Sequence, residues 1–72
     1  MPNRVTDTAY DLHNYIQWRA RHEGVGYSLS PEFFRAAIDA GTTSFFGVEI
    51  GESGLVGDSQ QPDLFRQWQA QQ

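Results

Sequence analysis

The period of the hydrophobic residues changes at Gly41, and this change limits the folds that the chain can adopt. Before Gly41, apolar residues recur at the three- and four-residue spacings of one face of an α-helix. After it, Phe46, Val48 and Ile50 alternate with their neighbours, which is the two-residue period of a strand. Helices followed by a strand in so short a chain predict a small α+β domain.

The first expected helix spans residues 7–22. Thr6 or Asp7 can cap its start, and Gly24 lies just beyond its end. At about 100° per residue, one face of this helix carries an apolar stripe that is typical of packing against a core. The members of this stripe are Val5, Ala9, Leu12, Ile16 and Ala20.

The second expected helix follows a glycine-containing connector, residues 24–30. Ser30 is its expected N-cap, and Pro31 fits the first turn because its missing N–H has no helical partner there. Gly41 stands where a helix commonly ends in the left-handed conformation. Apolar residues cover more than half of the circumference, so we expect this helix to be mostly buried.

The rest of the chain is expected to form a hairpin and a third helix. A strand near residues 45–50 is followed by a turn at 51–54 and a short returning strand at Leu55 and Val56. Residues 57–62 read as a linker, and residues 62–70 as a helix with Leu64, Phe65 and Trp68 on one side. The expected unit is one domain, 1–72, frayed at 1–5 and 70–72. The alternative is an all-α bundle in which residues 42–50 are helical or irregular.

Composition bounds the class of protein. The chain has 72 residues, enough for one domain, and its 39% hydrophobic and 14% aromatic content is that of a folded protein. It has no cysteine, so disulfides and thiolate metal sites are excluded. It has no apolar run near the roughly 20 residues that cross a bilayer, and its polar start lacks the core of a signal peptide. These features predict a cytoplasmic protein.

The charge balance argues against nucleic acid and anionic lipid as partners. The net charge is −4, with nine acidic residues, five arginines and no lysine. Binding to polyanions needs positive charge that displaces counterions. A helix–turn–helix is nevertheless an alternative, because Ala37 and Gly41 are four positions apart, as in that motif. Its second helix would be residues 42–52, which have no basic side chain to offer to phosphates or base edges.

A second stripe on the first helix is the candidate site. Asp11, Tyr15, Trp18 and His22 follow helical spacings on a side away from the core stripe, and Arg19 is adjacent in sequence. Tyrosine, tryptophan and arginine dominate the energetics of protein interfaces, so an exposed stripe of this kind predicts a partner surface. The alternatives are base stacking by the same aromatics and coverage by the last helix through its apolar side.

The leading functional hypothesis is therefore a non-catalytic protein-binding module, acting as an adaptor, regulator or inhibitor. Its partner would be a larger protein or a second copy of the chain, bound through the exposed aromatics of the first helix. The alternative is a small dimeric nucleic-acid-binding regulator of helix–turn–helix type. We expect no enzyme activity, cofactor or metal: His13 and His22 point about 180° apart on an ideal helix, and no catalytic constellation is present.

Overall fold

The computed structural model describes residues 8–72, which form three helices and a three-stranded antiparallel sheet with strand order β1-β2-β3. The elements are α1 (Thr8–Glu23), α2 (Pro31–Asp39), β1 (Ser44–Phe45), β2 (Val48–Gly51), β3 (Gly54–Asp58) and α3 (Pro62–Ala70). The α+β expectation is confirmed, and the all-α alternative is wrong. Strands follow α2, so the second helix of a helix–turn–helix is also wrong.

Some expectations concern residues that lie outside the described range. These are the capping of the first helix by Thr6 or Asp7, the core position of Val5 and the fraying of residues 1–5. At the other end, α3 extends to Ala70, and Gln71 and Gln72 are exposed.

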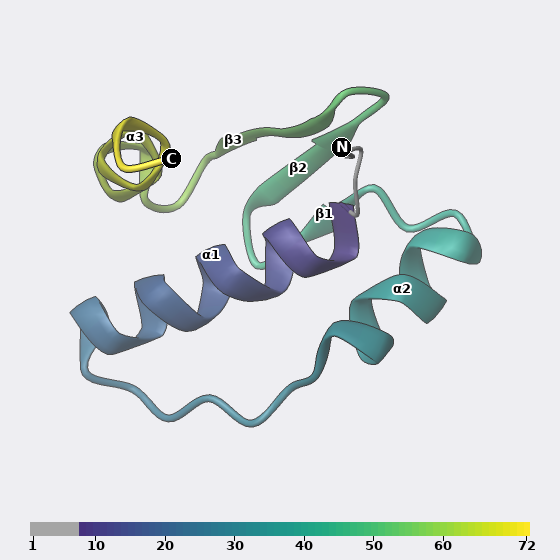
Figure 1. Cartoon of the computed structure of the whole chain (residues 1–72), viewed down its shortest axis with the longest axis horizontal. Coiled ribbons are helices and arrows are strands. Elements are labelled where there is room, and N and C mark those ends of the chain that lie inside the picture. Colours follow the sequence, from purple (N-terminus) through teal and green to yellow (C-terminus); the bar gives the residue numbers. More distant parts are fainter. Residues whose placement is uncertain (1–7) are drawn as a thin grey trace.

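Helix α1 lies at the centre of the molecule. The sheet and α3 pack on one side of it, and the connector, residues 24–30, runs back along another (Figure 1). Four of its expected core residues are buried, namely Ala9, Leu12, Ile16 and Ala20. Ala9, Leu12 and Ile16 join one core cluster with Phe34 of α2, Phe45 and Val48 of the sheet, and Phe65 and Trp68 of α3. Because a small domain has little interior, this helix contributes to the core from more than one face.

Helix α2 begins and ends as the sequence predicts. Ser30 is in the extended region at φ −118° and ψ 162°, and Pro31 occupies the first turn. At the other end, Gly41 has φ 101°, and the N–H groups of Gly41 and Thr42 donate to the carbonyls of Ile38 and Ala37. These two bonds satisfy carbonyls at the helix end, as in a Schellman motif.

The expectation that α2 is mostly buried is wrong. Phe34 is fully buried and its ring packs edge-on against Phe45, with ring centroids 5.4 Å apart. Phe33, the next residue along, is 48% exposed. The reason is that α2 lies at one end of the molecule and has α1 as its main neighbour, so that the wide apolar surface is covered on one side (Figure 1).

The single strand expected over residues 45–50 is two strands joined by a tight turn. Phe45 pairs with Val48, so Phe46 and Gly47 are the central residues of a two-residue turn. Both have positive φ, 52° and 92°, as a type I′ hairpin turn requires. The second hairpin agrees with the prediction, because Gly51 pairs with Gly54 around a second two-residue turn.

The β2–β3 pairing is interrupted by a bulge. Glu49 pairs with Gly57 and Ile50 with Leu55, which leaves Val56 as the extra residue of β3. Its side chain is 62% exposed. An extra residue bends the strand and disrupts its hydrogen-bonding row, and this makes a sheet edge a poor template for pairing.

Candidate functional site

Tyr15, the first aromatic of the expected partner stripe, is in the core rather than on the surface. It is fully buried, and its ring packs edge-on against Phe65 and Trp68 of α3, at centroid distances of 5.2 and 5.3 Å. The expectation of an exposed Tyr15 is wrong, and the alternative in which the last helix covers the stripe holds at this residue. The cause is the placement of α3 against α1, which gives α1 a second buried side.

Arg19 is also buried, with 7% of its surface exposed. Its Nη1 donates to Oδ2 of Asp58 at 2.6 Å and to the carbonyl oxygen of Phe46 at 3.1 Å. Its Nε lies 3.8 Å from Oε1 of Glu23, one helical turn further along α1. The guanidinium therefore ties α1 to the β1–β2 turn and to the end of β3, and it is not an exposed interface arginine.

The carboxylate of Asp58 is the centre of this polar arrangement. It is 5% exposed, and its Oδ2 accepts hydrogen bonds from the Tyr15 hydroxyl at 2.5 Å and from Arg19. Its Oδ1 accepts from the backbone N–H groups of Gln60 and Gln61, at 2.9 and 3.1 Å. We call Tyr15, Arg19 and Asp58 the Asp58 cluster. Its carboxylate is matched by four donors, so the cost of burying the charge is offset.

Burial and hydrogen bonding move the pKa values of this cluster in opposite directions. For Asp58, burial favours the neutral acid, but the bonds from Tyr15, Arg19 and the two backbone amides outweigh it and hold the pKa below its usual range. For Tyr15, burial and the adjacent carboxylate raise the pKa well above 10. The cluster therefore holds a neutral phenol, an anionic carboxylate and a guanidinium at neutral pH.

The remaining stripe residues lie nearer to solvent. Trp18 is partly buried against the core, and the ring of His22 packs on it at a centroid distance of 4.1 Å. His22 itself is exposed, and its Nδ1 lies 3.1 Å from the carbonyl oxygen of Trp18. Asp11 is exposed near the start of α1. The structure thus separates the predicted site into a buried part, Tyr15 and Arg19, and an accessible part.

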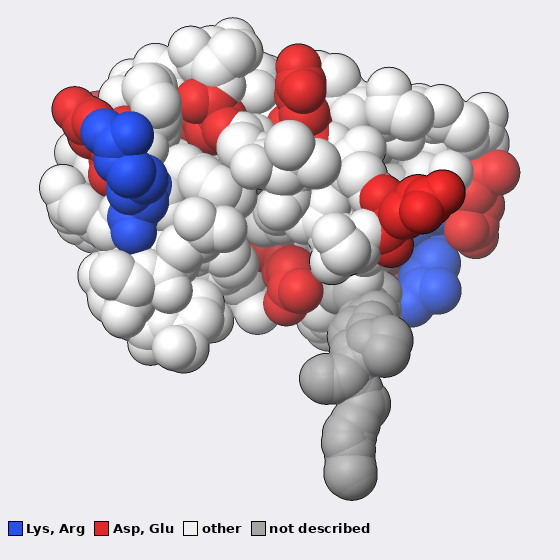
Figure 2. Space-filling view, turned by 90° about the horizontal axis from the view of Figure 1, so that it is seen from above, with Lys and Arg blue, Asp and Glu red and all other residues white. Residues whose placement is uncertain are grey.

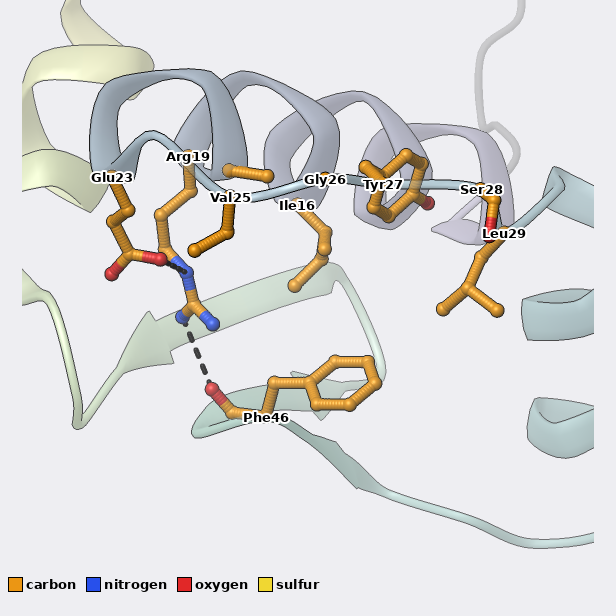
Figure 3. A pocket seen from close by; sticks show the side chains of 10 residues that line it. Ile16, Arg19, Glu23, Val25, Gly26, Tyr27, Ser28, Leu29 and Phe46 are labelled. Atoms are coloured by element: carbon orange, nitrogen blue, oxygen red, sulfur yellow. Dashed lines mark hydrogen bonds and ion pairs between the residues drawn. The ribbon is translucent and has the colours of Figure 1, made fainter.

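A groove that the sequence did not indicate lies beside α1. Its volume is about 320 Å³, and it is bounded by the second half of α1, the connector and the β1–β2 turn (Figure 3). Val25 and Phe46 line it and are themselves 56% and 51% exposed. Tyr27 and Leu29 of the connector also line it and are partly buried against the core. We call this hollow the connector groove.

Phe46 combines an unusual backbone with an exposed ring. At φ 52° it is the one described residue other than glycine with positive φ. For a bulky side chain this left-handed conformation is a true outlier, and turns of this type normally carry Asn, Asp or Gly. The hydrogen bond from Arg19 to its carbonyl oxygen fixes the turn from the interior. The sequence contains one signal for this turn, which is Gly47 directly after Phe46. The alternation of apolar residues alone predicts a continuous strand at this point.

The exposed charge of the described chain is predominantly acidic. Figure 2 shows acidic side chains spread over one face, with basic side chains near its two ends. Arg19 is buried together with Asp58, so one charge of each sign leaves the surface and the acidic excess of the chain stays there. Among residues 8–72, no group of three or more His, Asp or Glu side chains comes together that could hold a metal ion. No helix in the same range is long and apolar enough to span a membrane.

Comparisons of the chain with protein-family models, with curated proteins and with solved structures found no match.

Proposed function

We propose that this chain is a non-catalytic protein-binding module that accepts apolar side chains of a larger protein in the connector groove. Within that class it would act as an adaptor, a regulator or an inhibitor. The observation that carries the proposal is Phe46. Its aromatic ring lines an apolar groove, although its backbone has the left-handed conformation that is unfavourable for a bulky side chain.

The energetics of Phe46 favour a role in binding over a role in folding. A left-handed conformation costs an L-residue about 1–2 kcal/mol relative to an ordinary one. Half of the surface of Phe46 remains in water, so the free chain gains only part of the burial that an aromatic ring can provide. Contact with a partner would bury the rest, and aromatic residues seated in well-packed contacts are typical interface hot spots.

The geometry also favours the connector groove over the predicted stripe. Tyr15 and Arg19 are buried, so the accessible part of the stripe is reduced to Trp18, His22 and Asp11. The groove offers a concave surface with several apolar residues, which is the usual form of a recognition site. On the helical wheel, Trp18 lies almost opposite Ile16, a residue of the groove, so the two surfaces do not merge.

The Asp58 cluster supports a non-catalytic function. A general base has to reach the proton of a substrate, directly or through one water. The carboxylate of Asp58 is instead occupied by Tyr15, Arg19 and two backbone amides below the surface. A cluster built in this way holds segments of the chain together.

The test uses a substitution that removes the ring and relieves the backbone. Phe46→Asn creates the Asn-Gly pair that type I′ turns prefer, so relief of strain offsets the lost ring contacts. We expect its free energy of unfolding to stay within about 1 kcal/mol of wild type. Wild type, Phe46→Asn and the control Val56→Ser are each immobilised and incubated with a nuclease-treated native extract. The proteins that each bait retains are quantified by mass spectrometry. Val56 is a matched control because it is also exposed and apolar, but it lies on the bulge of β3.

We expect a protein that wild type and Val56→Ser retain equally and that Phe46→Asn loses. The same protein, purified, should bind wild type directly in solution. Equal retention by all three baits would contradict the proposal. Recovery that is seen only in a parallel extract without nuclease would point to nucleic acid, and a concentration-dependent dimer in sedimentation, lost in Phe46→Asn, would point to self-association.

A further inference from the structure

We infer that the connector is itself a binding element: a partner segment in extended conformation, carrying apolar residues and a lysine or arginine, adds to it as a β-strand. This inference rests on the proposed function and specifies the partner's form. Three independent features carry it. Residues 25–30 have an extended conformation, their central backbone groups are unpaired, and an acidic side chain lies beside them.

The connector already has the shape of a strand. It runs back beside α1 for most of the length of that helix, and a short segment can do so only when it is extended (Figure 1). Burial alternates along it, since Tyr27 and Leu29 are partly buried while Gly26 and Ser28 are exposed. Its last residue, Ser30, has the φ and ψ of extended chain. Figure 3 shows the same segment passing along α1 at the edge of the groove.

The backbone groups in the middle of this segment are unpaired. At its two ends, the N–H of Val25 donates to Ala20 and the carbonyl of Ser30 accepts from Phe33. Between them, no backbone N–H or C=O of residues 26–29 is hydrogen-bonded to another group of the described chain. An extended segment with a free row of donors and acceptors is a template for strand addition, in which main-chain hydrogen bonds supply much of the affinity.

The sheet edges are poorer templates than the connector. At one edge, β1 has only two residues, and at the other, β3 carries the bulge at Val56. Short and bulged edges are devices by which proteins prevent strand addition. The connector has neither device, and it lies beside the connector groove.

The groove and its rim define the side chains of the partner segment. The space between Val25 and Phe46 fits an apolar side chain. Glu23 lines the same groove, and its contact with Arg19, at 3.8 Å, is longer than a hydrogen bond. The Arg19 guanidinium is held more closely by Asp58, so the Glu23 carboxylate is an acceptor for a basic side chain from outside. The net charge of −4 would attract such a segment.

The connector is also held in place before binding. The Tyr27 hydroxyl and Nδ1 of His13 share a hydrogen bond of 2.8 Å, and their rings are in tilted contact. Burial raises the pKa of Tyr27, so its phenol stays neutral. A template fixed to α1 in this way loses less conformational entropy on binding than a free loop would.

The test starts from peptides rather than from an extract. Short random peptides displayed on phage are selected against the immobilised wild-type chain, and the enriched peptides are then measured on wild type and on Phe46→Asn. The enriched peptide is synthesised in two further forms, each N-methylated at alternate residues, so that the two forms block opposite edges of the same strand. Affinity is measured by fluorescence anisotropy, and amide exchange of residues 26–29 is followed by NMR with and without the peptide.

We expect the enriched peptides to combine alternating apolar residues with lysine or arginine. N-methylation in one register should weaken binding at least about tenfold, the equivalent of one or two hydrogen bonds, while the other register stays within about twofold. Addition of the peptide should slow the exchange of alternate connector amides, either those of Gly26 and Ser28 or those of Tyr27 and Leu29.

The outcomes separate this inference from the proposed function. A peptide that depends on Phe46, but that tolerates N-methylation in both registers and leaves the connector amides unprotected, overturns strand addition and leaves the groove as the binding site. A peptide bound equally by Phe46→Asn overturns the proposed function. Enriched peptides that bind as helices, or that are acidic, overturn the inferred partner chemistry.

Discussion

The Asp58 cluster and the connector lie beside the same helix, yet their polar groups have opposite environments. In the cluster, one carboxylate accepts four hydrogen bonds and almost no surface is exposed. In the connector, no backbone N–H or C=O of residues 26–29 is hydrogen-bonded to another group of the described chain. Buried and fully paired groups resist local opening, whereas exposed and unpaired segments belong to the low-stability end of a protein. From this difference we expect the first region to carry stability, and we propose the second as the recognition element.

The substitution that tests this comparison most directly is Asp58→Asn, which has the largest expected effect on stability. The substitution keeps the shape of the side chain but leaves Arg19 buried without its anion and weakens the bond from Tyr15. Breaking a buried ion pair from one side typically costs about 3–5 kcal/mol. We expect most of the stability of so small a domain to be lost, as measured by urea unfolding followed by circular dichroism.

Asp63→Asn is the control for that experiment. Asp63 also pairs with an arginine, Arg66, but both side chains are more than 70% exposed. Exposed pairs of this kind contribute at most about 1 kcal/mol. Equal losses in the two variants would show that the Asp58 cluster does not hold the fold.

Two glycines sharpen the contrast. Gly47, in the β1–β2 turn, has φ 92°, and an added Cβ would lie 2.6 Å from Cγ of Gln60 and 3.1 Å from Oδ1 of Asp58. We expect Gly47→Ala to lower the free energy of unfolding by about 2–3 kcal/mol, through strain and displacement of these neighbours.

Gly26 in the connector has no atom within 4 Å of the added Cβ. Gly26→Ala should be neutral or stabilising by up to about 1 kcal/mol in thermal and urea unfolding. A Gly26→Ala loss as large as that of Gly47→Ala would contradict the contrast.

The acid arm of the pH dependence of stability should report on Asp58, and the alkaline arm on Tyr15 together with Tyr27, whose pKa burial also raises. The lowered pKa of Asp58 gives stability that is present above the unfolded-state value, about 4, and that is lost as the pH falls through the folded value. The raised pKa of Tyr15 gives stability that is full below about pH 10 and is lost at higher pH.

Tyr15→Phe should cost about 1–2 kcal/mol at neutral pH and reduce the alkaline loss. Urea midpoints measured across the pH range would check both arms, and an unchanged alkaline arm in Tyr15→Phe would assign that loss to other groups.

The smallest effect is expected in the connector. Tyr27→Phe removes the hydrogen bond to His13 but keeps the ring. Because this bond is partly exposed, its loss should cost less than about 1 kcal/mol in urea unfolding. Tyr10→Phe, at a tyrosine that is 52% exposed, provides the baseline. A loss comparable with that of Asp58→Asn would mean that the connector is a structural element and not a recognition surface.

The sequence was sufficient to predict those parts of the fold that depend on local chemistry. The start of α2 at Pro31, its end at Gly41 and the turn between Gly51 and Gly54 follow from residues that favour those conformations. The continuous strand was wrong because alternation of apolar residues cannot detect that Phe46 adopts a positive φ. Gly47 was the local indication of a turn at that point.

The candidate site depended on contacts that no local pattern contains. Tyr15 was assigned to the surface because it lies away from the apolar stripe of α1, yet α3 covers it. Asp58 fell in an expected linker, although it bonds to side chains 39 and 43 positions earlier in the chain. The connector groove arises only when the connector folds back beside α1 and meets the β1–β2 turn.

The position of Asp58 along the chain also determines when the protein can fold during its synthesis. Arg19 is synthesised 39 positions before the carboxylate that neutralises it, and α3, which covers Tyr15, comes later still. Contacts between residues so far apart in sequence form slowly, since a long loop has to close first. A nascent chain that still lacks these residues would have to bury an unpaired guanidinium in order to collapse. Stable packing around α1 therefore waits until the chain has been synthesised through α3.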